Sequence, residues 1–199
     1  MTSMTIADLT AKIKSGEVDT VVVAMTDMQG RLTGKRIHGK FFLDEVLKHG
    51  TEGCNYLLAV DVDMNTVDGY EMSSWERGYS DFALVPDMDT LRMIDWQEGA
   101  ALVLADVQWL DHTDVVASPR QILRKQVKAL KDAGMEAMCG TELEFVVYKD
   151  TYEEAWNKGY KNLIPVNQYN VDYSILGGSR IEPLLRRIRL SMAKAGMTV

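Results

Sequence analysis

The first 110 residues alternate short apolar runs with polar turns, and this pattern predicts a small sheet domain with one or two helices. The β-branched run 18–24 predicts a buried strand, and residues 32–37 predict a neighbouring strand whose basic side chains suit the edge of a sheet. Apolar residues at helical spacing, each series followed by a glycine, predict helices that begin near Thr5 and Lys40. Further strands are expected over residues 54–62, 81–86, 91–94 and 100–108.

A second domain is predicted to follow the stretch 111–117, which is polar and has no helical period. We therefore place the two domains at residues 1–112 and 113–199. The second domain is expected to contain a helix, a strand, another helix over about 179–195, and the first residues of a further strand. This is too little sheet to cover two amphipathic helices, so we expect the chain to be part of a longer protein or to complete its fold with a partner.

The first helix of this second domain has clear signals at both ends. Ser118 suits the N-cap, Pro119 suits the first helical position, and Gly134 suits the end of the helix. Arg120 lies in the first turn, where the helix dipole disfavours a cation, so we expect a specific carboxylate to hold it. The apolar stripe that this helix is expected to bury consists of Ile122, Leu123, Val127 and Leu130.

The stretch 140–148 contains two glutamates, and its branched and aromatic residues predict a β-strand. Alternate side chains of a strand share a face, so Glu142 and Glu144 are expected to point the same way, about 6.5–7 Å apart. At that separation two carboxylates repel by about 2–2.5 kcal/mol at an effective dielectric of about 20. They are either solvated on an open face or, on an enclosed face, neutralised by basic side chains or by a hard cation such as Mg²⁺.

Residues 61–80 are the least regular part of the chain, and a loop of this length in a compact domain is often functional. Asp61 and Asp63 lie at its start, in a run that lacks the glycine and the glutamate of a calcium-binding loop. Trp75 lies towards its end. We expect this side chain to be buried against its own domain, with stacking on a substrate or on a neighbouring subunit as the alternative.

Composition and charge exclude several classes of function. The net charge of −7 and the absence of a Lys/Arg run argue against nucleic acid or an anionic membrane surface as a partner. Two distant cysteines, Cys54 and Cys139, fit a reducing compartment and do not make a zinc motif. We find no signal peptide and no apolar run long enough to span a bilayer, so we expect a cytoplasmic protein.

Four segments of the chain, in order and at matching separations, resemble the glutamine synthetase family. Residues 20–31 resemble the opening hairpin of its N-terminal β-grasp domain, and residues 80–87 resemble its segment ending in Pro-Asp. Residues 118–123 are similar to the start of its catalytic domain, and residues 140–145 match its G-x-E-x-E-F motif. The resemblance implies an α+β protein, in which a β-grasp-like domain is followed by the truncated start of a glutamine synthetase-type catalytic domain.

The resemblance also implies a reaction and a metal site. The family uses ATP to convert the γ-carboxylate of glutamate to an acyl phosphate, from which an amine displaces phosphate. Glu142 and Glu144 are then implied ligands of Mg²⁺ or Mn²⁺. Glu144 would bind the metal that orients the substrate carboxylate and activated phosphate, and Glu142 would help to hold the metal that bridges the ATP phosphates. The stretch 169–172 is a candidate for facing the nucleotide.

One departure from the family pattern bears on the acceptor amine. Members that use ammonia have a D-G-S-S type loop, whereas the corresponding stretch here reads Asp61-Val62-Asp63-Met64-Asn65. Asp61 or Asp63 is expected to take the place of the family's substrate-binding aspartate. We therefore favour an organic amine of the polyamine or ethanolamine type. An ammonia-using glutamine synthetase is the first alternative, and a non-catalytic interaction module is the second.

The remaining metal ligands and catalytic residues are expected beyond residue 199, so we expect this chain alone to be inactive. The resemblance further implies a homo-oligomer with active sites between adjacent subunits in the full enzyme.

Overall fold

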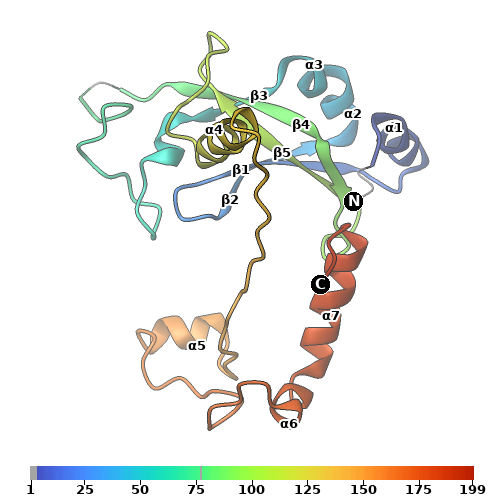
Figure 1. Cartoon of the computed structure of the whole chain (residues 1–199), viewed down its shortest axis with the longest axis vertical. Helices are drawn as coiled ribbons and strands as arrows, with labels where there is room; N and C mark the ends of the chain where they lie inside the picture. The colour runs from blue at the N-terminus through green and yellow to red at the C-terminus, as the bar shows by residue number, and fades with distance from the viewer. Residues whose placement is uncertain (1–3, 77) are drawn as a thin grey trace. The chain divides into compact units, whose positions relative to one another are not determined.

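The computed structural model describes residues 4–76 and 78–199, which form a mixed α+β protein (Figure 1). The chain divides into two compact units. The first comprises Met1–Ala137 with Lys194–Thr198, and the second comprises Met138–Ala193 with Val199. None of the helices among the described residues is long and apolar enough to cross a membrane.

A five-stranded sheet in the order β2-β1-β5-β4-β3 is the framework of the first unit. The central strands β1 and β5 are parallel, with Thr20 beside Ala100 and Ala24 beside Leu104, and the other neighbours are antiparallel. The predicted edge position of the second strand is confirmed, because β2 pairs only with β1 in this sheet. The strands are β1 (Thr20–Thr26), β2 (Leu32–His38), β3 (Thr51–Cys54), β4 (Asp81–Met93) and β5 (Ala100–Gln108).

Two helical segments supply the other layer of this unit. Helix α1 (Ile6–Ser15) begins at a capping box between Thr5 and Asp8 and ends at Gly16, whose φ of 77° suits glycine. The second helical segment runs without a break through α2 (Gly39–Phe41), a π-helical turn η1 (Phe42–Val46) and α3 (Leu47–His49). Both helix predictions for this unit are confirmed.

The hydrophobic core lies between these helices and one face of the sheet. Alternate residues of β1 and β5 point into it, and their register places Val21 beside Ala101 and Val23 beside Val103. The helices contribute fully buried Leu9 and Phe42. The opposite face of the sheet is the one that carries Asp106.

Two strand predictions in this unit were wrong. Residues 81–93 form one long strand instead of two, because a register shift between Asp87 and Arg92 accommodates the predicted turn without reversing the chain. The strand expected over 54–62 is mostly replaced by the 3₁₀ turn η2 (Asn55–Leu58). The long irregular loop that follows was predicted correctly.

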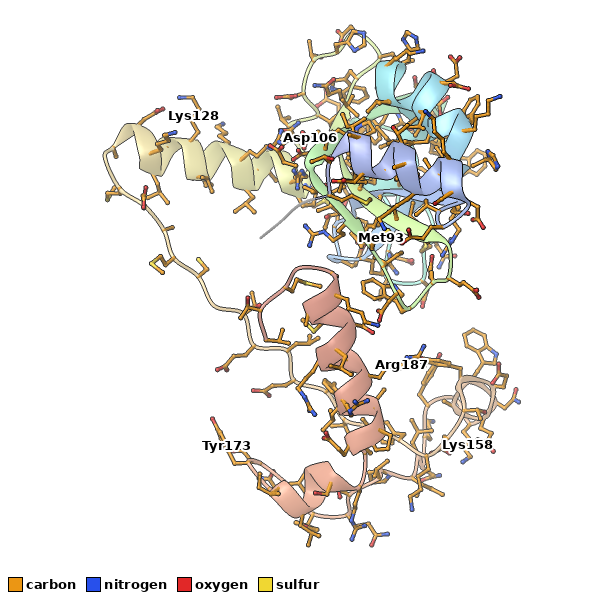
Figure 2. The ribbon with its side chains drawn as sticks, turned by 90° about the vertical axis from the view of Figure 1, so that its right-hand side faces the viewer. Met93, Asp106, Lys128, Lys158, Tyr173 and Arg187 are labelled. Atoms are coloured by element: carbon orange, nitrogen blue, oxygen red, sulfur yellow. The ribbon has the colours of Figure 1, made fainter. Side chains whose placement is uncertain are left out.

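Helix α4 (Pro119–Asp132) leaves the sheet of the first unit with its apolar side uncovered. Ser118 occupies the N-cap and Pro119 the first position, as predicted, although the Ser118 side chain makes no capping hydrogen bond. The predicted burial of the stripe was wrong, since Ile122, Leu123 and Val127 are 46%, 63% and 54% exposed. Figure 2 shows the reason: α4 meets the sheet near Asp106, whereas Lys128 lies well away from it.

The second unit consists of an extended segment and three helices. Tyr148 forms an isolated bridge with Pro165, and Lys149 and Val166 add backbone hydrogen bonds to Ile164 and Val147. This pairing closes a loop that contains α5. The helices are α5 (Tyr152–Asn157), α6 (Ile175–Ser179) and α7 (Glu182–Lys194).

Candidate functional site

The two glutamates predicted to bind a metal lie on an extended segment that is not part of any sheet. No strand is assigned at residues 135–147, so the predicted strand was wrong for this structure, and Glu142 and Glu144 are both exposed. A strand needs a neighbour for its backbone hydrogen bonds, and none of the described residues pairs with this segment before Val147. Phe145 is correspondingly 54% exposed instead of facing a core.

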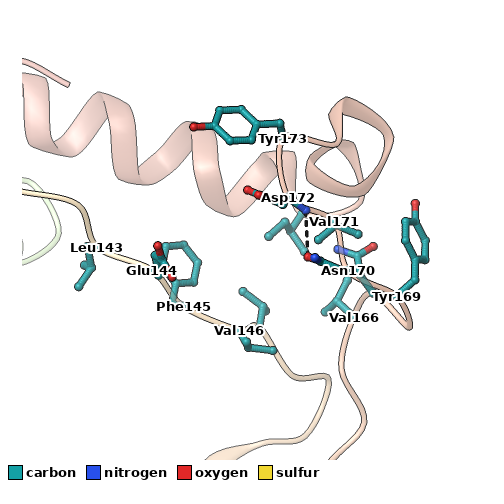
Figure 3. Close-up of a pocket in the computed structure, with 13 residues that line it drawn as sticks. Leu143, Glu144, Phe145, Val146, Val166, Tyr169, Asn170, Val171, Asp172 and Tyr173 are labelled. Carbon is teal, nitrogen blue, oxygen red and sulfur yellow. Dashed lines mark hydrogen bonds between the residues drawn. The ribbon is translucent and has the colours of Figure 1, made fainter.

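Glu144 nevertheless borders a hollow of the second unit. The hollow has a volume of about 690 Å³ and lies between the extended segment and residues 166–173. Figure 3 shows Glu144 on one of these sides and Asp172 on the other. The loop bearing Asp172 is folded by a hydrogen bond of 3.3 Å from the Asp172 backbone N–H to the side-chain oxygen of Asn170. The stretch 169–172 and Glu144 therefore border one space, whereas Glu142 is not among the residues that line it.

The extended segment offers carboxylate ligands of the type that a divalent cation prefers, but too few of them to hold one. Carboxylate oxygens are the ligands that Mg²⁺ and Mn²⁺ prefer. Among the described residues, however, no group of three or more His, Cys, Asp or Glu side chains is arranged to hold a metal ion. Glu142 and Glu144 as seen here do not form a metal site by themselves, and we derive no chemical step through a metal from them.

The second candidate region is the loop that begins at Asp61, in the first unit. The Asp61 carboxylate accepts hydrogen bonds from the backbone N–H groups of Asp63 and Asn65, both at 2.9 Å, and from the Asn65 side chain at 3.2 Å. The backbone and side-chain hydrogen bonds from Asn65 hold the pKa of Asp61 below its usual range. Asp61 therefore shapes the loop as an anion, while the Asp63 side chain is exposed.

An ion pair between a buried aspartate and a partly exposed arginine, in the hairpin between β1 and β2, holds this loop in place. Asp27 is 1% exposed, and its carboxylate accepts the Arg31 Nε–H at 2.7 Å and the backbone N–H groups of Gln29 and Arg31. Burial acts to raise the pKa of Asp27, but the hydrogen bonds from Arg31 and Gln29 outweigh it and leave the pKa below its usual range. Arg31 then donates to the Val62 carbonyl at 2.5 Å, and Gln29 donates to the Val60 carbonyl at 3.0 Å.

The sequence predicted neither this ion pair nor its hydrogen bonds to the loop, because residues 28–31 indicated only a turn. The atoms that these hydrogen bonds join come from segments about thirty residues apart, and no local periodicity signals such a pair. An Asp-x-x-x-Arg spacing across a tight turn, next to a long polar loop, is the sole hint that the sequence offers.

The sequence predicted a carboxylate partner for Arg120 without naming one, and the structure supplies two, Asp106 and Asp87. Arg120 forms ion pairs with both aspartates, and its Nε lies 2.8 Å from an Asp106 oxygen. Arg124, one turn later, also pairs with both, and its Nη2 lies 3.1 Å from an Asp87 oxygen. Asp106 lies on β5 and Asp87 at the register shift of β4. We call these four residues the arginine–aspartate cluster. It fixes the first turn of α4 to the sheet.

The comparison with solved structures defines the class of fold. A crystal structure described as that of a novel glutamine synthase homolog aligns with 90% of this chain and 39% of its own, with a TM-score of 0.56. The two sequences are 17% identical, so this likeness concerns the fold alone. The mixed α+β architecture is thus that of a glutamine synthetase-like protein.

Sequence comparisons point to the same family. Residues 116–199 match the family model described as the catalytic domain of glutamine synthetase. The chain is 62% identical over 194 residues to the gamma-glutamylethanolamide synthetase GlnA4 of Streptomyces coelicolor, covering 98% of this chain and 42% of that protein. It is 32% identical over 187 residues to a glutamate–isopropylamine ligase of a Pseudomonas species, covering 94% of this chain and 41% of that protein. The chain is thus similar to members of the glutamine synthetase family, and it spans about two fifths of the length of these relatives.

Proposed function

We propose that this chain is the N-terminal part of an ATP-dependent ligase that joins the γ-carboxylate of glutamate to an organic amine. The observation that supports this most is the 62% identity, over nearly the whole chain, to a protein named for making gamma-glutamylethanolamide. A second relative is named for joining glutamate to isopropylamine. Both names specify an organic amine, and we propose an acceptor of the ethanolamine or polyamine type in preference to ammonia.

The proposed reaction has two balanced steps. A γ-carboxylate oxygen of glutamate attacks the γ-phosphorus of ATP, the bond to the bridging oxygen breaks, and ADP leaves with that electron pair. An amine that arrives as an ammonium ion first gives up one proton to solvent; its nitrogen then attacks the acyl carbon of the γ-glutamyl phosphate, inorganic phosphate leaves, and the nitrogen loses a second proton. Negative charge spreads over phosphoryl oxygens in both steps, so positioned cations favour both.

We propose that Glu142 and Glu144 contribute to a Mg²⁺ or Mn²⁺ site that would supply this cationic stabilisation. Their oxygen ligands suit such a cation, and Glu144 borders the same hollow as residues 169–172, for which we propose contact with the nucleotide. The other ligands would come from outside the described residues. For this reason the 199-residue chain alone is expected to be inactive.

We propose that Asp61 and Asp63 serve the acceptor side of the reaction. Asp61 is already engaged in folding its loop, so we assign it the positioning of Asp63. Asp63 presents an exposed carboxylate, which suits attraction of a protonated amine.

Several finer features belong to the same proposal. We propose a β-grasp-like domain at residues 1–112, the start of the catalytic domain at residues 113–199, and a cytoplasmic homo-oligomer with active sites between adjacent subunits. The match of the catalytic-domain model to residues 116–199 supports the division into domains.

The decisive experiment measures phosphate release from ATP by the full-length protein with glutamate and, in turn, ethanolamine, putrescine, isopropylamine or ammonium. We expect phosphate release only when glutamate and an organic amine are both present, and a γ-glutamylamide product by mass spectrometry. A clear preference for ammonium would instead establish a glutamine synthetase. Absence of turnover with every amine would favour the non-catalytic interaction module.

A further inference from the structure

Three aromatic rings gather at the long loop of the first unit, and the sequence predicted burial for the outermost of them. The Trp75 and Tyr79 rings lie 5.2 Å apart at 89°, and the Tyr79 and Tyr56 rings lie 6.0 Å apart at 86°. We call these three side chains the aromatic patch. Trp75 is 77% exposed, so the predicted burial against its own domain was wrong.

The base of the aromatic patch is fixed to the sheet unit. Asn55 precedes Tyr56 in η2 and is 2% exposed. Its backbone N–H donates to the Ser80 carbonyl at 2.8 Å, and its side-chain NH₂ donates to the Met72 carbonyl at 3.1 Å. A bridge between Ser74 and Gly78 closes the tip of the loop. The backbone on both sides of Trp75 is therefore held in place while its ring is exposed to solvent. Because the loop is already ordered, binding of a ligand costs little conformational entropy.

The surroundings of the aromatic patch are acidic. Residues 61–80 include five acidic side chains and one basic one, Arg77, so the loop carries a net negative charge. Such a loop raises the local concentration of cations. A tryptophan face attracts an organic ammonium group more strongly than any other side-chain ring does, and the apolar carbons of the ligand pack on the same surface. A Trp75 needed only for folding would be expected to lie in the core.

We propose that Trp75, supported by Tyr79 and Tyr56, is a binding surface for the organic ammonium group of the acceptor substrate. This inference rests on the proposed ligase function and adds a site to it. Asp63 and the other loop carboxylates attract the cation, and the aromatic patch holds its alkyl and ammonium parts together. The aromatic patch thus favours an organic amine over ammonium, because the ammonium ion is small, strongly hydrated and has no alkyl part to pack on the rings.

The first test uses the 199-residue chain and follows its four tryptophan indole N–H signals by NMR during titration with ethanolamine hydrochloride. We expect the Trp75 signal to shift saturably, with smaller changes at Trp96, Trp109 and Trp156. Ethylene glycol, which is similar in size but uncharged, is expected to leave Trp75 unchanged at equal concentration. Equal shifts of all four signals, or no shift at Trp75, would overturn the proposal.

The second test uses the full-length enzyme. We expect Trp75→Ala to raise the KM for the amine about tenfold and Trp75→Phe to raise it less, since phenylalanine retains a ring face. The KM values for glutamate and ATP should stay unchanged in both variants. Trp96→Phe is the matched control, because Trp96 is also partly exposed, at 43%, but lies outside the loop.

The two proposals fail in different ways. Amide formation with an amine KM that Trp75→Ala leaves unchanged would refute the aromatic patch and keep the ligase. A saturable Trp75 shift in the 199-residue chain, together with a full-length protein that makes no amide, would refute the ligase and keep the patch as a cation site. Because Trp75 is exposed, its variants are expected to fold, and an unchanged circular dichroism spectrum checks this.

Discussion

At the scale of single residues, the arginine–aspartate cluster shows how a charge can be disfavoured locally and still be well placed. Arg120 stands at the positive end of α4, where the helix dipole opposes it. Two aspartates of the sheet more than compensate, because each arginine reaches both of them. Asp106 is 9% exposed, so its pairing takes place in a partly desolvated setting where charge interactions are stronger than at the surface.

We expect Asp106→Asn to lower the free energy of unfolding by about 1–3 kcal/mol, because it leaves Arg120 half-buried with one carboxylate instead of two. Urea denaturation monitored by circular dichroism measures the loss. Asp132→Asn is the control, since it removes the exposed Lys128–Asp132 pair on the same helix and should cost at most about 0.5 kcal/mol. Equal effects of the two substitutions would contradict a role for the cluster.

Asp150 in the second unit predicts a specific dependence on pH. The hydrogen bond from Lys158 and then the backbone N–H of Ile164 lower the pKa of Asp150, and the bond to Asp150 raises the pKa of Lys158. The stabilisation by Asp150 is therefore complete above about pH 3.9 and is lost as the pH falls through its folded pKa. The contribution of Lys158 is complete below about pH 10.4 and is lost as the pH rises through its raised value.

Between about pH 4 and pH 10 we therefore expect constant protection of the Ile164 amide against hydrogen exchange, after correction for the intrinsic rate. Asp150→Asn retains an acceptor for Ile164 but removes the charge, so it should reduce the protection and abolish its loss in acid. Lys158→Gln should lower protection similarly, and the double variant should be no worse than either single variant. Additive losses would show that the two groups act separately.

At the scale of elements, helices whose end signals lie in their own sequence were predictable, whereas strands that depend on a distant partner were not. Helix α1 was predictable because its capping box and terminal glycine lie within its own sequence. The strand expected around Glu142 was not realised, because a strand depends on a neighbour that its own residues cannot specify. The same reasoning applies to the candidate site. The carboxylates were predictable as residue types, whereas the partners of Arg120, 14 and 33 positions away, were not.

The pairing of β2 with β1 depends on a glycine that faces the neighbouring backbone. A Cβ atom added at Gly34 would lie 2.0 Å from the Val23 carbonyl oxygen, which is inside the contact distance of the two atoms. We expect Gly34→Ala to cost roughly 2–4 kcal/mol, because β2 must shift in register or move away from β1. Hydrogen exchange at the β2 amides measures the local loss.

Gly30→Ala in the turn of the same hairpin is the control for this prediction. Gly30 has a φ of 81° and open space around its added Cβ, so only backbone strain of about 1–2 kcal/mol is expected. A Gly34→Ala protein as stable as the Gly30→Ala protein would show that the backbone of β2 absorbs the collision.

At the scale of the whole molecule, the described residues combine a well-packed sheet unit with apolar surface that nothing in them covers. Leu123 on α4 and Leu143 on the extended segment are 63% and 87% exposed. The chain also spans about two fifths of the length of its relatives. The sequence predicted α4 and its apolar stripe correctly, but burial of that stripe depends on residues other than those that form it.

The parallel pairing of β1 with β5 sets the order in which the sheet unit can assemble. Thr20 pairs with Ala100, so closing the centre of the sheet requires a long loop to be ordered first. At about 5–20 residues per second, a ribosome needs roughly 4–16 s to make the sequence between these two residues. Throughout that interval β1 has only the edge strand β2 as a strand partner, and Val21 and Val23 lack their neighbours on β5. Strand β1, an inner strand of the finished sheet, is thus prone to aggregate during synthesis until β5 has been made.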